Sequence, residues 1–202
     1  MLDGWARARI DPALDRAGRS LARSGVTANA VTLAAFAAGF AAFVAIALEA
    51  YLSGLFLLLL SRIGDGLDGA VARHTRKSDF GGYLDIVLDF AFYGLVPLGF
   101  VLADPSANSV AGAVLILSFY VNGASFLAYA VMAEKRGLST DARGEKSLFF
   151  TTGLAEATET IAFFVAFCLF PEWFAVLAFV FAALCFYTAV SRIVIAARTF
   201  RE

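Results

Sequence analysis

Charged residues are scarce in this sequence. Only 16% of its 202 residues are Asp, Glu, Lys or Arg, whereas a soluble domain carries about 25%. Hydrophobic residues make up 60% of the chain. This composition excludes an ordinary soluble domain and indicates a membrane protein. The formal net charge is −1, so no basic excess favours nucleic acid as a partner.

Prolines, cysteines and linker-like segments are also few. The chain has four prolines and no tract rich in Ser, Gly and Pro, which predicts a single membrane domain over residues 1–202. The two cysteines, Cys168 and Cys185, lie in apolar runs without metal-site spacing, so we interpret them as buried packing residues. The alternating pattern of a β-barrel is absent, and a backbone in lipid must satisfy its own hydrogen bonds, which together predict an all-α fold.

Several apolar segments are long enough to cross a membrane as helices, since about 20 residues span the ~30 Å hydrocarbon layer. Six spans are predicted, at residues 28–48, 51–73, 80–103, 108–133, 147–170 and 173–198. Residues 1–25 instead scatter five arginines among apolar side chains. This pattern is typical of an amphipathic segment on the membrane surface, although a solvated lead-in helix would also fit. The predicted fold is a polytopic six-helix transmembrane bundle over residues 26–202, preceded by an amphipathic interfacial helix.

Lys and Arg occur in alternate connections between these segments. The connections around Glu49, Asp104 and Pro171 contain none, whereas residues 73–77, residues 135–146 and both termini are basic. By the positive-inside rule, the basic side faces the cytoplasm. We therefore predict a multi-pass protein of the cytoplasmic (inner) cell membrane, with both termini in the cytoplasm.

Four aspartates lie in or beside the second and third apolar segments. Asp65 and Asp68 are three residues apart, and Asp85 and Asp89 are four apart, so each pair shares one face of its helix. The connection between the two segments is short, which makes the helices antiparallel neighbours. All four carboxylates are therefore expected to converge on one pocket near the cytoplasmic face.

Carboxylates inside lipid need positive charge beside them. Ligand sets made only of oxygen favour Mg²⁺ or Mn²⁺, and four carboxylates could hold two such ions with positions left open for the oxygens of a diphosphate. Nearby glycines would let a bulky ligand approach the backbone. In the structural alternative, Arg62 and Arg192 pair with the acids, but two cations cannot neutralise four aspartates together with Glu156 and Glu159.

The run from Asp65 to Arg73, followed by the run from Gly81 to Asp89, resembles the signature of the CDP-alcohol phosphatidyltransferase family, D-x-x-D-G-x-x-A-R and then G-x-x-x-D-x-x-x-D. Seven residues separate Arg73 from Gly81, where the family more often has eight. The resemblance extends to the topology, because members of this family carry six helices after a short amphipathic one.

The resemblance implies an enzyme of phospholipid biosynthesis. It would move a phosphatidyl group from a CDP-linked lipid, CDP-diacylglycerol, to the hydroxyl of an acceptor alcohol and release CMP, with its active site near the cytoplasmic face. Asp89 would be the catalytic base. The residues that would ligate two divalent ions, Mg²⁺ or Mn²⁺, are Asp65, Asp68, Asp85 and Asp89. The residues that would bind CDP are Asp65, Gly69, Ala72, Arg73 and Gly81. Homodimers are common in the family, so a second copy of the chain is an expected partner.

Four further residues are candidates for binding the acceptor: Arg143, Lys146, Glu156 and Glu159. The two glutamates share a helix face deep in the fifth segment. They would either pair with Arg62 or Arg192 or hydrogen-bond the acceptor. The two basic residues would bind a phosphorylated acceptor or simply follow the positive-inside rule. The acceptor stays open among glycerol 3-phosphate, serine, an inositol phosphate and phosphatidylglycerol.

Two other functions use similar acids. A magnesium-dependent membrane prenyltransferase also holds a diphosphate with aspartate pairs, but such enzymes usually need more spans and lack the D-G-x-x-A-R pattern. A divalent-cation transporter would need access from both sides of the membrane. The four aspartates cluster near one end of their helices, which argues against transport.

Overall fold

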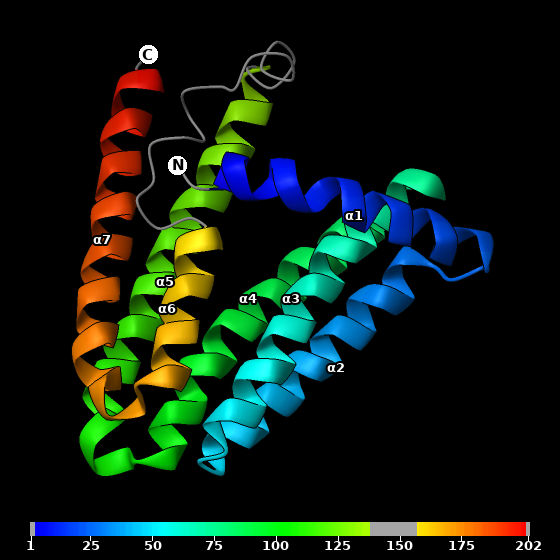
Figure 1. The fold of residues 1–202 in the computed structure, drawn as a ribbon. Coiled ribbons are helices and arrows are strands. Elements are labelled where there is room, and N and C mark those ends of the chain that lie inside the picture. The colour runs from blue at the N-terminus through cyan, green and yellow to red at the C-terminus, as the bar shows by residue number, and fades with distance from the viewer. Residues whose placement is uncertain (1–2, 138–156, 201–202) are drawn as a thin grey trace.

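The computed structural model describes residues 3–137 and 157–200, and in these ranges every regular element is helical (Figure 1). The all-α prediction is therefore confirmed. The elements are α1 (Asp3–Arg23), α2 (Ala28–Ala47), α3 (Tyr51–His74), α4 (Asp79–Ala103), α5 (Pro105–Lys135), α6 (Ala157–Leu169), the 3₁₀ turn η1 (Pro171–Trp173) and α7 (Phe174–Thr199).

Polar residues set the starts of several helices. The Thr27 side chain accepts a hydrogen bond from the Ala30 amide at 3.3 Å where α2 begins. Ser78 does the same for the Gly81 amide at 3.0 Å where α4 begins. Asp104 precedes α5 and accepts from two amides of its first turn. Such caps satisfy amides that have no partner inside the helix.

The helices form an upright bundle with α1 lying crosswise over one end (Figure 1). Helices α2, α3 and α4 pack together, α5 packs on α7, and α4 joins the two groups through its contact with α5. Helix α1 packs on α3, and a Cβ at Gly18 would lie only 2.6 Å from Ala70 Cβ. Glycine at this position therefore permits the close approach of α1 to α3.

Four of the described helical segments are long and apolar enough to cross a membrane: α2, α4, α5 and the unit Pro171–Thr199. The expected number of six is not confirmed by length and composition. Helix α3 has 24 residues, but Arg62, Asp65, Asp68 and Arg73 interrupt its apolar sequence. The described part of α6 has only 13 residues.

Aromatic side chains fill the centre of the bundle. Phe100 of α4 stacks on Phe174 of α7 with ring centroids 4.7 Å apart, and Phe163 of α6 stacks on Phe181 of α7 at 4.3 Å. Buried rings of this kind add to the energy of apolar burial. Cys168 and Cys185 are buried free thiols in the same core, which agrees with their interpretation as packing residues.

Candidate active site

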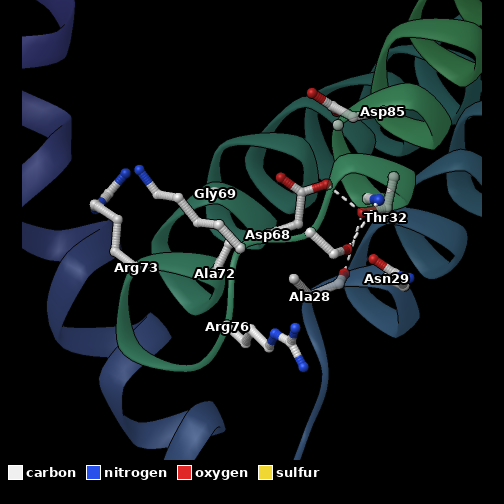
Figure 2. Close-up of a pocket in the computed structure, with 13 residues that line it drawn as sticks. Ala28, Asn29, Thr32, Asp68, Gly69, Ala72, Arg73, Arg76 and Asp85 are labelled. Carbon is white, nitrogen blue, oxygen red and sulfur yellow. Dashed lines mark hydrogen bonds between the residues drawn. The ribbon is translucent and has the colours of Figure 1, made fainter.

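A cavity of about 320 Å³ opens between α2, α3 and α4 (Figure 2). Asp68 and Asp85 contribute carboxylates to its wall. Four of the five residues predicted to bind CDP also line it, namely Gly69, Ala72, Arg73 and Gly81. Asp65, the fifth, lies earlier on α3 and is not part of the wall. The connection between α3 and α4 is shorter than the family usually has, yet Arg73 and Gly81 still face the same cavity.

Small residues keep this cavity open. A Cβ at Gly81 would lie 2.9 Å from Asn29 Oδ1, so a larger residue would displace its neighbours. A Cβ at Gly69 would meet only Arg73 Nη1, at 3.9 Å. Arg76 and Lys77, together with Arg73, give the wall three cationic side chains. A cavity with this lining suits a bulky anionic ligand such as a diphosphate.

Asp68 is oriented by Thr32, a residue of α2. The Thr32 hydroxyl donates a hydrogen bond to Asp68 Oδ2 at 2.5 Å, and Asp68 is only 6% exposed (Figure 2). The sequence analysis did not single out Thr32. Its only signal was a hydroxyl in an otherwise apolar span, three residues after Asn29. The structure thus adds a partner from a third helix to the acidic set.

Asp65 and Asp89 meet at the guanidinium of Arg62. Arg62 Nη1 lies 2.5 Å from Asp89 Oδ1 and 3.5 Å from Asp65 Oδ1. The other two carboxylates, Asp68 and Asp85, lie in the cavity wall. The structure therefore brings Asp65 of α3 to Asp89 of α4 at Arg62, and it places Asp68 of α3 and Asp85 of α4 at one cavity.

As the carboxylates stand, no three His, Cys, Asp or Glu side chains of the described ranges are arranged around a single metal position. Asp65 and Asp89 face Arg62 instead, and Asp68 faces Thr32. The donor set still fits a hard divalent ion, because it consists only of carboxylate oxygens. Arg62 already supplies a positive charge between two of them.

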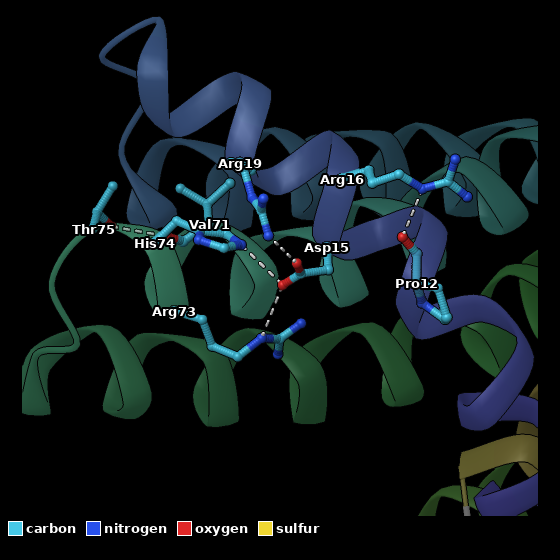
Figure 3. A network of polar contacts seen from close by, with 8 residues as sticks. All are labelled: Pro12, Asp15, Arg16, Arg19, Val71, Arg73, His74 and Thr75. Atoms are coloured by element: carbon cyan, nitrogen blue, oxygen red, sulfur yellow. Dashed lines mark hydrogen bonds and ion pairs between the residues drawn. The ribbon is translucent and has the colours of Figure 1, made fainter.

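Helix α1 contacts Arg73, a residue of the cavity wall, through Asp15 (Figure 3). Asp15 Oδ1 accepts a hydrogen bond from His74 Nε2 at 2.9 Å and lies 3.7 Å from Arg73 Nε, and Asp15 Oδ2 lies 3.3 Å from Arg19 Nη2. The hydrogen bond from His74 lowers the pKa of the Asp15 carboxyl. Arg73 thus contacts α1 through Asp15, a link that the sequence did not predict because the two residues are far apart in the chain.

Among the acceptor candidates, Arg143, Lys146 and Glu156 lie outside the described residues. Glu159 lies in α6, and its Oε2 atom is buried without a hydrogen-bond partner. Of the two alternatives for Glu159, an ion pair with Arg62 or Arg192 is not formed among the described residues. Arg62 instead pairs with the aspartates, and Arg192 Nη1 donates to Asn122 Oδ1 at 3.0 Å and to Ser125 Oγ at 2.7 Å.

A larger cavity of about 640 Å³ lies among α4, α5, α6 and α7. Its wall combines aromatic side chains, including Tyr93 and Phe119, with the Arg192 guanidinium. It shares no lining residue with the first cavity.

The motif and its geometry agree with a comparison against known families. The family model for CDP-alcohol phosphatidyltransferase matches residues 25–191. The chain belongs to this family. It is therefore an enzyme, a membrane-bound transferase of phospholipid biosynthesis, and divalent metal ions are generally used in the family.

Individual relatives extend over nearly the whole chain. The inner membrane protein YnjF of Escherichia coli (strain K12) is 47% identical over 193 residues, which cover 96% of this chain and 94% of that protein. An archaetidylinositol phosphate synthase of Pyrococcus horikoshii is 28% identical over 162 residues, covering 79% and 86%. A second one, from Methanothermobacter thermautotrophicus, is 28% identical and covers 92% and 87%.

A solved structure shares the fold. The crystal structure of Mycobacterium tuberculosis phosphatidylinositol phosphate synthase (PgsA1) with CDP-DAG bound superposes with a TM-score of 0.70. It covers 89% of this chain and 91% of that chain at 22% sequence identity. The arrangement of helices around the cavity is therefore one that this family fold adopts.

Proposed function

We propose that this enzyme transfers a phosphatidyl group from CDP-diacylglycerol to the hydroxyl of an acceptor alcohol and releases CMP. The observation that carries the proposal is the cavity between α2, α3 and α4, whose wall combines small residues, three cations and the motif aspartates Asp68 and Asp85, while Asp65 and Asp89 meet at Arg62 on the same two helices, α3 and α4. This combination would accept a nucleotide diphosphate and its counter-ions. It favours the transferase over a prenyltransferase or a cation transporter, because neither alternative explains the D-G-x-x-A-R residues in the cavity wall.

The donor would bind with its diphosphate beside Arg73, Arg76 and Lys77. Gly69, Ala72 and Gly81 would leave room for the nucleotide. Asp65, which lies four residues before Gly69 on α3, would also contact the CDP group. Asp65, Asp68, Asp85 and Asp89 would hold two divalent ions, Mg²⁺ or Mn²⁺. When bound, these ions would neutralise the diphosphate and stabilise the phosphate that leaves with CMP.

Asp89 would act as the general base. Its carboxylate would take the proton from the acceptor hydroxyl, and the hydroxyl oxygen would form a bond to the phosphorus of the phosphatidyl group. The bond from that phosphorus to the oxygen of CMP would break at the same time, in line with the attack. CMP would leave through the mouth of the cavity, and Asp89 would return its proton to solvent.

The acceptor proposed is an inositol phosphate or a similar phosphorylated polyol. The support is the similarity to two relatives, both archaetidylinositol phosphate synthases, at 28% identity. Arg143, Lys146, Glu156 and Glu159 remain the residues expected to contact this acceptor. The buried Oε2 atom of Glu159 has an unused acceptor position that a sugar hydroxyl would satisfy.

The membrane arrangement proposed is one domain over residues 1–202 with six spans, formed by α2 to α7, and with α1 on the cytoplasmic surface. The basic connections support this orientation, and α1 lies across the end of the bundle that holds the cavity (Figure 1). Both termini would then be cytoplasmic, in the inner membrane. A homodimer is proposed because homodimers are common in the family and because small-residue stretches let helices pack closely.

The test is an assay of purified protein with CDP-diacylglycerol, Mg²⁺ or Mn²⁺, and a panel of acceptors. We expect CMP release only with a suitable acceptor, and mass spectrometry should find one phospholipid product for each CMP. An inositol phosphate is expected to give the highest rate. Cation flux through proteoliposomes in the absence of CMP release would reject the proposal in favour of transport.

A further inference from the structure

Arg62 is a buried cation that the family motif does not include. It lies on α3, three residues before Asp65, and its side chain is 10% exposed. Its guanidinium contacts Asp89 at 2.5 Å and Asp65 at 3.5 Å through the same Nη1 atom. A buried charge is costly unless it is paired. Arg62 and these two acids therefore stabilise each other in the bundle.

The two aspartates that Arg62 contacts are also proposed ligands of the divalent ions. An oxygen that points its lone pair at a guanidinium nitrogen cannot point it at a metal ion at the same time. Two neighbouring cations would also repel each other, strongly so where water is scarce. Arg62 and a divalent ion therefore compete for Asp89 Oδ1, mainly through the repulsion between the two cations.

The surroundings of Arg62 favour a group that can change partners. Its Nε atom is buried without a hydrogen-bond partner, so the present ion pair leaves one donor unsatisfied. The guanidinium also lies over the Phe92 ring, 3.8 Å from its centroid, and 5.9 Å from the centroid of Tyr93. Aromatic faces attract a cation without using its hydrogen bonds. They would retain the positive charge after Asp89 is released.

We infer that Arg62 is an internal counter-ion that neutralises Asp65 and Asp89 before metal binds and then competes with the metal for them. Metal binding therefore requires Arg62 to give up Asp89, which frees the carboxylate proposed to act as base. This inference rests on the proposed function, since it assumes that the aspartates ligate divalent ions. Arg62 is a positioning residue in this scheme and does not touch the reacting atoms.

The experiment measures Mn²⁺ binding directly, by electron paramagnetic resonance of free Mn²⁺, with purified full-length protein in detergent. Arg62→Gln removes the competing charge. Of the two proposed Mn²⁺ ions, the one that binds with lower affinity should bind this variant about tenfold more tightly than the wild type, a change of about 1.4 kcal/mol. Arg62→Lys keeps a charge but cannot form the same fork of hydrogen bonds. The Mn²⁺ affinity of Arg62→Lys should therefore lie between that of the wild type and that of Arg62→Gln.

Arg192→Gln is the matched control, because Arg192 is another arginine inside the bundle, partly buried, that bonds to Asn122 and Ser125 instead of the aspartates. Its Mn²⁺ affinity should equal that of the wild type. Thermal unfolding gives a second readout: Arg62→Gln should be less stable than the wild type in EDTA and should recover in Mn²⁺. If Arg62→Gln fails to fold in EDTA, folding on addition of Mn²⁺ supports the inference, and failure in both conditions overturns it.

The outcomes separate the inference from the proposed function. If the wild type binds Mn²⁺ and Arg62→Gln binds it equally or more weakly, Arg62 does not compete, and only the inference is rejected. If neither protein binds Mn²⁺, the proposed metal centre is rejected and the inference fails with it. Tighter binding by Arg192→Gln would show that any lost cation has this effect, which also overturns the specific role of Arg62.

Discussion

The hydrogen bond between Thr32 and Asp68 allows a sharp test of the acidic site. Thr32→Val keeps the shape of the side chain and removes only the hydroxyl that donates to Asp68 Oδ2 at 2.5 Å. Both residues have little exposed surface, so the Asp68 carboxylate would lose a charge-assisted hydrogen bond that bulk solvent replaces only in part. A hydrogen bond to a charged group contributes about 1.5–3 kcal/mol. We expect the metal-free variant to lose about that much free energy of unfolding.

The same variant should lose much less stability when Mn²⁺ is present, because a bound ion would give Asp68 a new partner. The assay is reversible unfolding in mixed detergent micelles, performed in EDTA and in Mn²⁺. Ser118→Ala is the control, since the Ser118 hydroxyl is buried but donates to a neutral acceptor, the Leu115 carbonyl, at 2.7 Å. Its loss should be smaller and independent of metal. An equal loss for Thr32→Val in EDTA and in Mn²⁺ would refute the reasoning.

Three other substitutions have defined outcomes. Asp89→Asn should leave a folded protein whose CMP release falls by at least about 10²-fold, as expected for loss of a general base; turnover near the wild-type rate would remove Asp89 from that role. Asp15→Asn should raise the KM for CDP-diacylglycerol with little change in kcat, because Asp15 contacts Arg73, which is proposed to bind the donor. Asp11→Asn, a neighbour on α1, is its control, and an equal effect of both variants would contradict the assignment. Gly18→Ala should cost about 1–3 kcal/mol by overpacking, since its Cβ would lie 2.6 Å from a side chain of α3. Gly94→Ala, where a Cβ meets nothing within 4 Å, should cause no loss of stability in the same unfolding assay.

Spacing along the chain was enough to predict much of this architecture. The limits of α2, α3 and α4 agree closely with the apolar segments, because each segment ends where polar or cap residues begin. The pairing of the aspartates also followed from helical periodicity, since residues three or four apart share a face. Helix α3 differs from the other two in composition. It has 24 residues, enough to cross a membrane, but its charged side chains lower its mean hydropathy, so it is not among the candidate spans.

Contacts between distant helices could not be predicted in this way. Thr32 and Asp68 are 36 residues apart, and Asp15 and His74 are 59 apart. Nothing in local periodicity indicates which faces of two helices meet. Arg62 illustrates the same limit: its distance of three residues from Asp65 suggested a structural ion pair, but its shorter contact is with Asp89 on α4. Only the packed bundle shows that this arginine lies among the motif carboxylates.

The central claim is that the four aspartates form a centre for divalent ions and a nucleotide diphosphate. Anomalous X-ray scattering from crystals grown with Mn²⁺ and CDP-diacylglycerol tests it most directly. We expect two manganese peaks contacted by Asp65, Asp68, Asp85 and Asp89, with the diphosphate beside them. Manganese peaks at other side chains, or a nucleotide bound without manganese among these aspartates, would contradict the account.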